Sequence, residues 1–130
     1  MGGSSLSCTE TPVLPTPTAQ NVPVVSESFV GSIPVAGEAF YSFSTTQYGN
    51  VMLTLLDLKE AGTSTGVQVS VGVGHPLGTT CVLTQAVNAS TSATPQLTTP
   101  LAAGVYCARI ADLGNITATA TFALTIVHPR

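Results

Sequence analysis

The side chains that could carry chemistry are few in this chain of 130 residues. Its two histidines, His75 and His128, are each followed by a proline. A cysteine or serine hydrolase needs a nucleophile, a histidine base and a group that orients the histidine. The zinc-protease pattern H-E-x-x-H and the redox pattern C-x-x-C are both absent from the sequence. We therefore expect both histidines to lie in solvent-exposed loops, and we expect the protein not to be an enzyme.

The acidic residues could instead hold a metal ion. Calcium takes several clustered oxygen ligands, and Asp57 with Glu60, or Asp112 with Asn115, could contribute to such a site on loops. The alternative for the segment from Asp112 to Asn115 is a turn in which the aspartate bonds the backbone. The turn is favoured, so we expect no metal, no cofactor and no catalytic residue. A glycosidase is disfavoured as well, because the six acids are spread over the chain rather than paired.

Three cysteines bear on the compartment. Cys81 and Cys107 each lie within a strand-like run, and we predict that they form a disulfide. Closing a loop of about 26 residues stabilises a fold by about 3.5 kcal/mol in the chain-entropy model. Such bonds persist in oxidising compartments, whereas the alternative is two free thiols in a reducing cytosol. Cys8, in the N-terminal segment, is either free or cross-links two chains.

Charged residues make up 7% of the chain, against roughly 25% in typical soluble domains. The cations are Lys59, Arg109 and Arg130, too few for the phosphate contacts that nucleic-acid binding needs or for a polybasic membrane patch. Apolar runs also fall short of the roughly 20 residues that span a bilayer. Sugar binding is weakly supported, because Trp is absent and Tyr48 is the one tyrosine outside the expected core.

Apolar and polar residues alternate along several segments, which is typical of a strand with one buried face. The clearest case is 117–127, TATATFALTIV, and the valines at 67, 69, 71 and 73 repeat the pattern. Short strands separated by Gly, Pro and Asn predict an all-β antiparallel β-sandwich, jelly-roll-like, with about eight strands. The expected strands are 27–33, 38–45, 50–58, 66–74, 80–85, 96–98, 104–111 and 117–127. A helical turn is considered only for 56–62.

The same parity predicts the core. In addition to the apolar residues of the two clearest segments, the expected inward side chains are Tyr41, Phe43, Val51, Leu53, Leu55, Tyr106, Ala108 and Ile110. The outer face of the strand at 104–111 then carries Cys107 and Arg109.

The chain divides into residues 1–24, a linker or tail rich in Pro, Ser and Thr, and residues 25–130, the sandwich. The alternative is that 22–25 adds an edge strand. The sequence shows no signal peptide, so export would require that a signal has been removed. One hypothesis is that Met1 stands where a bacterial lipoprotein carries its lipidated cysteine, ahead of a flexible tether.

Two segments resemble the bacterial pre-peptidase C-terminal domain family and its uncharacterised lipoprotein relatives. The first is GEAFYSFS at 37–44, followed by the Gly-led apolar strand GNVMLTL at 49–55. The second, LAAGVYCARI at 101–110, is similar to the family's L-x-x-G-x-Y-x-x-x-V strand. The resemblance spans about residues 25–128. It implies an eight-stranded jelly-roll-like sandwich with a non-catalytic, accessory role. We expect this chain to differ from most members of the family in having no attached enzyme.

Together these features favour a non-catalytic, exported β-sandwich module that binds or spaces components of the bacterial cell envelope. The expected location is periplasmic, anchored at the outer membrane or extracellular, and the expected partner is a protein or another envelope component. The alternative is a self-assembling structural protein, such as a viral decoration, filament or surface-layer subunit. Low charge and Thr-rich strands would help copies of such a subunit pair at their sheet edges.

Overall fold

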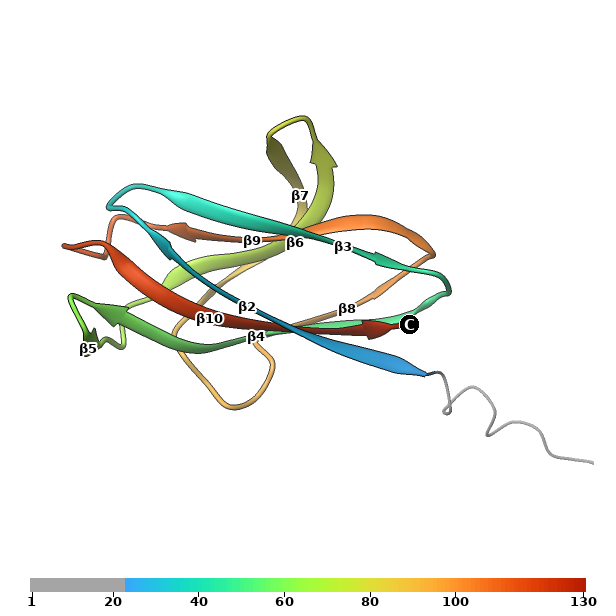
Figure 1. The fold of residues 1–130 in the computed structure, drawn as a ribbon, viewed down its shortest axis with the longest axis horizontal. Coiled ribbons are helices and arrows are strands. Elements are labelled where there is room, and N and C mark those ends of the chain that lie inside the picture. Colours follow the sequence, from blue (N-terminus) through green and yellow to red (C-terminus); the bar gives the residue numbers. More distant parts are fainter. Residues whose placement is uncertain (1–22) are drawn as a thin grey trace, which may run out of the picture.

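The computed structural model describes residues 23–130, and all the regular structure in that range is β-strand (Figure 1). The strands are β2 (Val24–Ile33), β3 (Glu38–Thr45), β4 (Gly49–Glu60), β5 (Thr63–Ser64), β6 (Val69–Leu77), β7 (Thr80–Ala89), β8 (Leu97–Leu101), β9 (Gly104–Asp112) and β10 (Ala120–Pro129). The predictions for Cys8, for the Met1 hypothesis and for most of the 1–24 linker lie outside the described residues.

Two antiparallel sheets form the sandwich. One has the order β2-β10-β4-β5, with β8 also pairing with β4, and the other has the order β3-β9-β6-β7. The chain crosses between the sheets at most of its connections, because β2, β4, β8 and β10 belong to one sheet and β3, β6, β7 and β9 to the other. This interleaving is the topology of a jelly roll. The predicted fold class is therefore confirmed.

The core between the sheets contains the residues that the alternation pattern predicts. Val51, Leu53 and Leu55 of β4 are fully buried, as are Leu124 and Ile126 of β10, which pairs with β4. Each such side chain contributes roughly 1.5–3 kcal/mol of hydrophobic stabilisation. The opposing sheet supplies Val69, Val71, Val73, Phe43, Tyr106, Ala108 and Ile110.

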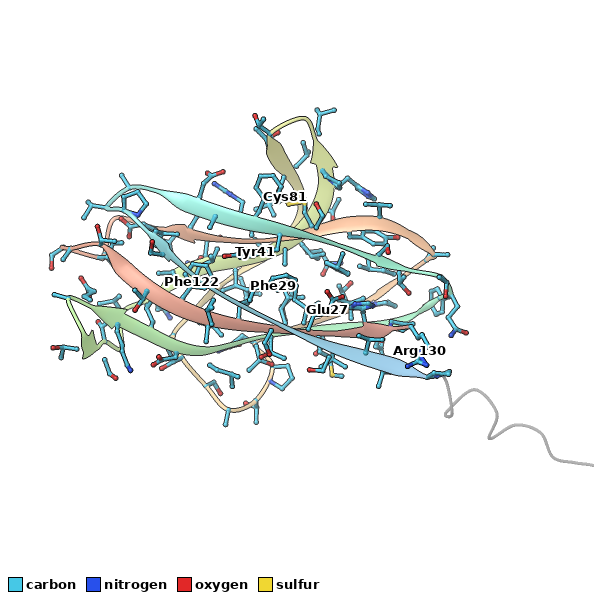
Figure 2. The ribbon with its side chains drawn as sticks, in the orientation of Figure 1. Glu27, Phe29, Tyr41, Cys81, Phe122 and Arg130 are labelled. Atoms are coloured by element: carbon cyan, nitrogen blue, oxygen red, sulfur yellow. A yellow bond between two sulfur atoms is a disulfide. The ribbon has the colours of Figure 1, made fainter. Side chains whose placement is uncertain are left out.

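Aromatic rings pack where β2 and β3, the edge strands of the two sheets, approach each other. The Phe29 and Tyr41 rings stack with centroids 4.4 Å apart, and Phe122 lies edge-on to Tyr41 at 6.2 Å (Figure 2). Tyr41 is half-buried rather than fully inside, because its hydroxyl reaches the β2 edge and donates to the carbonyl oxygen of Val30. The expected inward position of Tyr41 is thus only partly met.

A β-bulge in β4 accounts for one wrong prediction. Leu55 pairs with Leu124 and Asp57 pairs with Ala123, so Leu56 is the extra residue on β4. The bulge exposes Leu56 and buries Leu58, which reverses the parity of the strand. The segment 56–62 is therefore not a helical turn. It continues β4 to Glu60 and then turns back into β5 at Ala61 and Gly62, both with positive φ.

Several strand limits differ from the predicted ones. β2 begins at Val24 rather than at residue 27, and β10 begins three residues later than expected. The predicted strand end at residue 74 is also wrong, because β6 continues through Pro76 to Leu77. Proline is tolerated there because β6 pairs with β9 only as far as Gly74, so the missing N–H of Pro76 lies beyond that ladder.

Candidate functional site

The hairpin formed by β6 and β7 projects from the four-stranded sheet, and it is the most distinctive feature of the surface (Figure 1). A bulge marks the bend: Val73 pairs with Gln85 and Gly74 with Leu83, which leaves Thr84 as the extra residue. Gly74 is required at this point, since a Cβ there would lie 1.9 Å from the carbonyl oxygen of Val82. The bend therefore depends on the close backbone approach that only glycine allows.

A disulfide fastens this hairpin to the sheet. Cys81 of β7 is bonded to Cys107 of β9, with the two Cα atoms 5.9 Å apart, as the sequence predicts. Cys81 pairs with Pro76, one pair away from the turn that ends the hairpin, and Figure 2 labels it on the projecting hairpin. Cys107 sits on the outer face of β9 as expected, yet it is fully buried, because the hairpin covers it. The bond thus restrains the hairpin against a strand 26 residues further along the chain.

The hairpin carries exposed apolar side chains. Leu77 is 69% exposed and Val82 is 50% exposed, and Val105 of β9 is 57% exposed. The His75 ring lies 5.1 Å from the Tyr106 ring. Charged residues are absent from the whole stretch 61–108, which comprises β5 to β8 and half of β9. We call Leu77 and Val82 the hairpin patch.

Asp112 is a structural turn residue. Its Oδ1 accepts hydrogen bonds from the backbone N–H groups of Gly114, Asn115 and Ile116 at 2.9, 3.0 and 3.2 Å. Its Oδ2 accepts the N–H of Ala36 at 2.8 Å, from the connection between β2 and β3. These bonds, led by the one from Ala36, lower the pKa of Asp112 below its ordinary value of 3.8. The carboxylate therefore ties two loops together.

The other calcium candidates also have partners within the protein. The Asn115 side-chain amide donates to the carbonyl oxygen of Gln68 at 2.9 Å. Glu60 accepts the backbone N–H of Thr117 at 2.7 Å, and this bond lowers its pKa below 4.5. Asp57 lies 3.7 Å from Lys59 in an exposed ion pair. Within residues 23–130, no group of three or more His, Cys, Asp or Glu side chains is placed to hold a metal ion.

The sequence contains one hydrolase-like motif. The segment 62–66 reads GTSTG and matches the G-x-S-x-G pattern of a nucleophile elbow. That elbow is a sharp turn between a strand and a helix. Ser64 instead ends the two-residue strand β5, where it is exposed and pairs with Lys59 of β4. The local structure is therefore a β-hairpin rather than an elbow.

His128 is not in an exposed loop, contrary to expectation. It is 3% exposed, because β10 runs on to Pro129 and places His128 on the same inward face as Ile126. Its Nε2 lies 2.5 Å from Glu27 Oε2, and its Nδ1 lies 2.7 Å from the carbonyl oxygen of Pro129. The Phe43 ring packs 5.1 Å away. Extending the period-two pattern by two residues would have predicted this burial.

His75 is exposed as expected, but it lies on strand β6 rather than in a loop. Tyr48, the sugar-stacking candidate, is 67% exposed in the connection between β3 and β4. Tyr48 is thus accessible, but in the sequence it lies far from the hairpin patch.

A shallow depression of about 490 Å³ lies on the outer face of the five-stranded sheet. Its lining comes from β2, β4 and β10 and includes Gly31, Asp57, Lys59 and Thr121. The depression is open, and none of the histidines or cysteines within residues 23–130 lines it.

Comparisons with known proteins bear on the fold. No family model matches the chain, and no curated protein matches it. Two crystal structures share its architecture. The Yersinia pseudotuberculosis-derived mitogen aligns with a TM-score of 0.53 and 12% identity over 78% of this chain and 84% of that one. Salmonella Typhimurium PliG, a periplasmic lysozyme inhibitor of g-type lysozyme, aligns with a TM-score of 0.50 and 15% identity over 79% and 87%.

At these identities the likeness shows a shared β-sandwich and nothing finer. Two other observations concern location. The Cys81–Cys107 disulfide indicates an exported protein, because such bonds persist outside the reducing cytosol. In the part of the chain that the structure describes, no helix is long and apolar enough to cross a membrane.

Proposed function

We propose that this chain is a non-catalytic, exported module of the bacterial cell envelope that binds a protein or another envelope component through the hairpin patch. The observation that carries the proposal is the disulfide-fastened, uncharged hairpin with exposed Leu77 and Val82. A rigid support favours binding through exposed apolar side chains, because ordering them on binding costs little entropy.

Kinship with the pre-peptidase C-terminal family is part of the proposal. It is supported by where the resembling segments lie: GEAFYSFS leads into β3, GNVMLTL begins β4, and LAAGVYCARI leads into β9. An accessory role without catalysis follows from that kinship. Attachment to the outer membrane through a lipid on a cysteine at the position of Met1 is proposed with it, and the full gene sequence tests that attachment directly.

The binding role is tested by sedimentation with purified bacterial envelope fragments. We expect the protein to sediment with the fragments, and Val82→Asp to weaken this about tenfold or more, because it places a charge in the apolar contact. Digesting the peptidoglycan beforehand separates binding to the wall from binding to an envelope protein. A spacer without a binding role would stay in the supernatant, and that result would contradict the proposal.

Val30→Asp is the matched control. Val30 is likewise an exposed valine on a strand, 74% exposed, but it belongs to β2 of the other sheet. The control should sediment like the parent protein. Equal loss of binding in both variants would show that any surface charge weakens the contact, and the hairpin patch would then have no special role.

A further inference from the structure

The free edges of the two sheets differ in how they are protected against pairing with other strands. Natural edge strands usually carry a charge, a proline or a bulge, or are very short, because an unpaired row of N–H and C=O groups invites another strand. β2 carries Glu27, β3 carries Glu38 in an ion pair with Arg109, β8 contains Pro100, and β5 is two residues long. Four edges thus follow the usual pattern.

The free part of β4 is protected in another way. Between its contacts with β8 and β5, the side-chain amide of Gln96 substitutes for a neighbouring strand. Its Oε1 accepts the N–H of Leu55 at 2.8 Å, and its Nε2 donates to the carbonyl oxygen of Leu55 at 3.1 Å. The fold therefore satisfies a buried strand edge where no strand covers it.

β7 lacks these protections along its second half. It is the last strand of its sheet, and among residues 23–130 its strand partner is β6 alone. The bulge at Thr84 affects the first half, but the five residues Gln85–Ala89 pair regularly with Val69–Val73. They contain neither charge nor proline. Val87 and Ala89 pack inward, whereas Ala86 and Asn88 are exposed.

The charge and proline content of a segment determine whether it can pair with this edge of β7. When two identical strands pair about a two-fold axis, the same few residues of both copies lie close together. Any charge on this edge would therefore lie near a like charge of the other copy. The stretch 61–108 has no charged residue, and two copies of β7 can therefore approach without repulsion. The N-terminal segment of another copy is less suited, because Pro12, Pro15 and Pro17 lack the N–H groups that a ladder needs.

We propose that two copies of this chain associate through the 85–89 edge of β7, as antiparallel neighbours about a two-fold axis near Val87. Two four-stranded sheets then join into one continuous sheet of eight strands. In this register Ala86 of one copy lies opposite Asn88 of the other. The inference goes beyond the proposed function, since it uses the backbone of β7 and leaves the hairpin patch free for a different partner.

The test measures the oligomeric state of the full chain by size-exclusion chromatography with light scattering, over about 1–100 µM, where a small interface would dissociate. Cys8→Ser is included in every sample so that tail cross-links do not contribute. We expect the parent to change from monomer to dimer over this range. Ala86→Lys/Asn88→Lys should raise the dissociation constant about tenfold or more, because like charges then lie opposite each other.

Two matched variants complete the test. Ala86→Lys/Asn88→Glu places a lysine opposite a glutamate in the proposed register and should keep the dimer. Ser26→Lys/Ser28→Lys puts the same two charges on exposed positions of β2 and should also keep it. An intact disulfide by mass spectrometry and an unchanged melting temperature confirm that each variant is folded.

Three results would overturn the inference: a parent that stays monomeric throughout, a Lys/Lys variant that dimerises like the parent, or a β2 variant that dissociates equally. A dimer that resists the β7 changes would assign the contact to another surface or to the N-terminal segment. Binding to envelope fragments is measured separately with Val82→Asp. A failure to dimerise would therefore not contradict the proposed function, which has its own test.

Discussion

Several polar side chains in this protein hold separate segments of the fold together by hydrogen bonds. Asp112 holds the loop after β9 against the connection between β2 and β3, and Glu60 holds the chain at Thr117. His128 joins the last strand to β2 through Glu27. Asp112, Glu60 and His128, which are candidates for metal binding or catalysis by residue type, thus make contacts within the fold.

The lowered pKa of Asp112 predicts how stability depends on pH. A carboxyl group whose pKa is lower in the folded state stabilises the fold above its unfolded value, here about 3.8, and loses that effect as the pH falls through the folded value. Asp112→Asn should therefore lower the melting temperature by a few degrees at pH 7, and the gap to the parent should close in strong acid. Thermal melts followed by circular dichroism between pH 2 and 7, about the span of carboxyl titration, measure this.

Asp57→Asn provides the comparison for that experiment. Asp57 pairs with the exposed Lys59 and does not tie two loops together, so its removal should change the melting temperature little at any pH. A gap between Asp112→Asn and the parent that stayed constant down to the lowest pH would show that the carboxylate charge of Asp112 does not stabilise the fold.

Among the elements, β10 organises the larger sheet. It pairs with β2 on one side and with β4 on the other, and its even-numbered residues from Ala120 to Ile126 are buried. Its odd-numbered positions, such as Thr121, face outward. Adjacent residues of β10 are therefore buried and exposed in turn. Substituting one of each tests which face of the strand packs into the core.

Phe122→Asp should unfold the domain, whereas Thr121→Asp should be nearly silent. Phe122 is 3% exposed and contacts Tyr41, so the change removes a core ring and buries an unpaired carboxylate, at a cost of more than about 4 kcal/mol. Thr121 is exposed and lies opposite Lys59, which accommodates a carboxylate. Urea unfolding of both variants measures the difference. Similar destabilisation by the two would mean that the assignment of faces on β10 is wrong.

Across the whole molecule, charge is sparse and unevenly distributed. The six acidic residues and three cations all lie outside 61–108, so the strands β5 to β8 carry no Asp, Glu, Lys or Arg. Two of the cations, Lys59 and Arg109, are already paired with Asp57 and Glu38. The surface therefore offers little long-range attraction to charged partners, and specific recognition must depend on shape and apolar contact.

This charge distribution predicts that the protein does not bind nucleic acid. Each phosphate contact contributes through a Lys or Arg, and with three cations against six acids the net field is repulsive. Fluorescence anisotropy of a labelled DNA duplex should stay unchanged on adding the protein, even at about 10 mM salt, where electrostatic attraction is strongest. Salt-sensitive binding at micromolar protein would contradict this reading of the surface.

Much of the fold was predictable because period-two alternation is a local property. Val69, Val71 and Val73, like Phe122, Leu124 and Ile126, reveal their strands and their buried face without reference to the rest of the chain. The disulfide between Cys81 and Cys107 was predictable from two cysteines in strand-like runs. The scarcity of charge follows from composition directly.

Other features depend on contacts between distant segments. The bulge at Leu56 arises from how β4 pairs with β10, and it moves burial from Asp57 to Leu58. The partner of the buried His128 is Glu27, which lies 101 residues away and could not be predicted from the local pattern. The exposed hairpin patch and the unprotected edge of β7 exist only once the strands have taken their order in the sheets. Local sequence thus sets which face of a strand is apolar, whereas pairing partners, bulges and free edges follow from tertiary packing, because they are properties of two segments rather than of one.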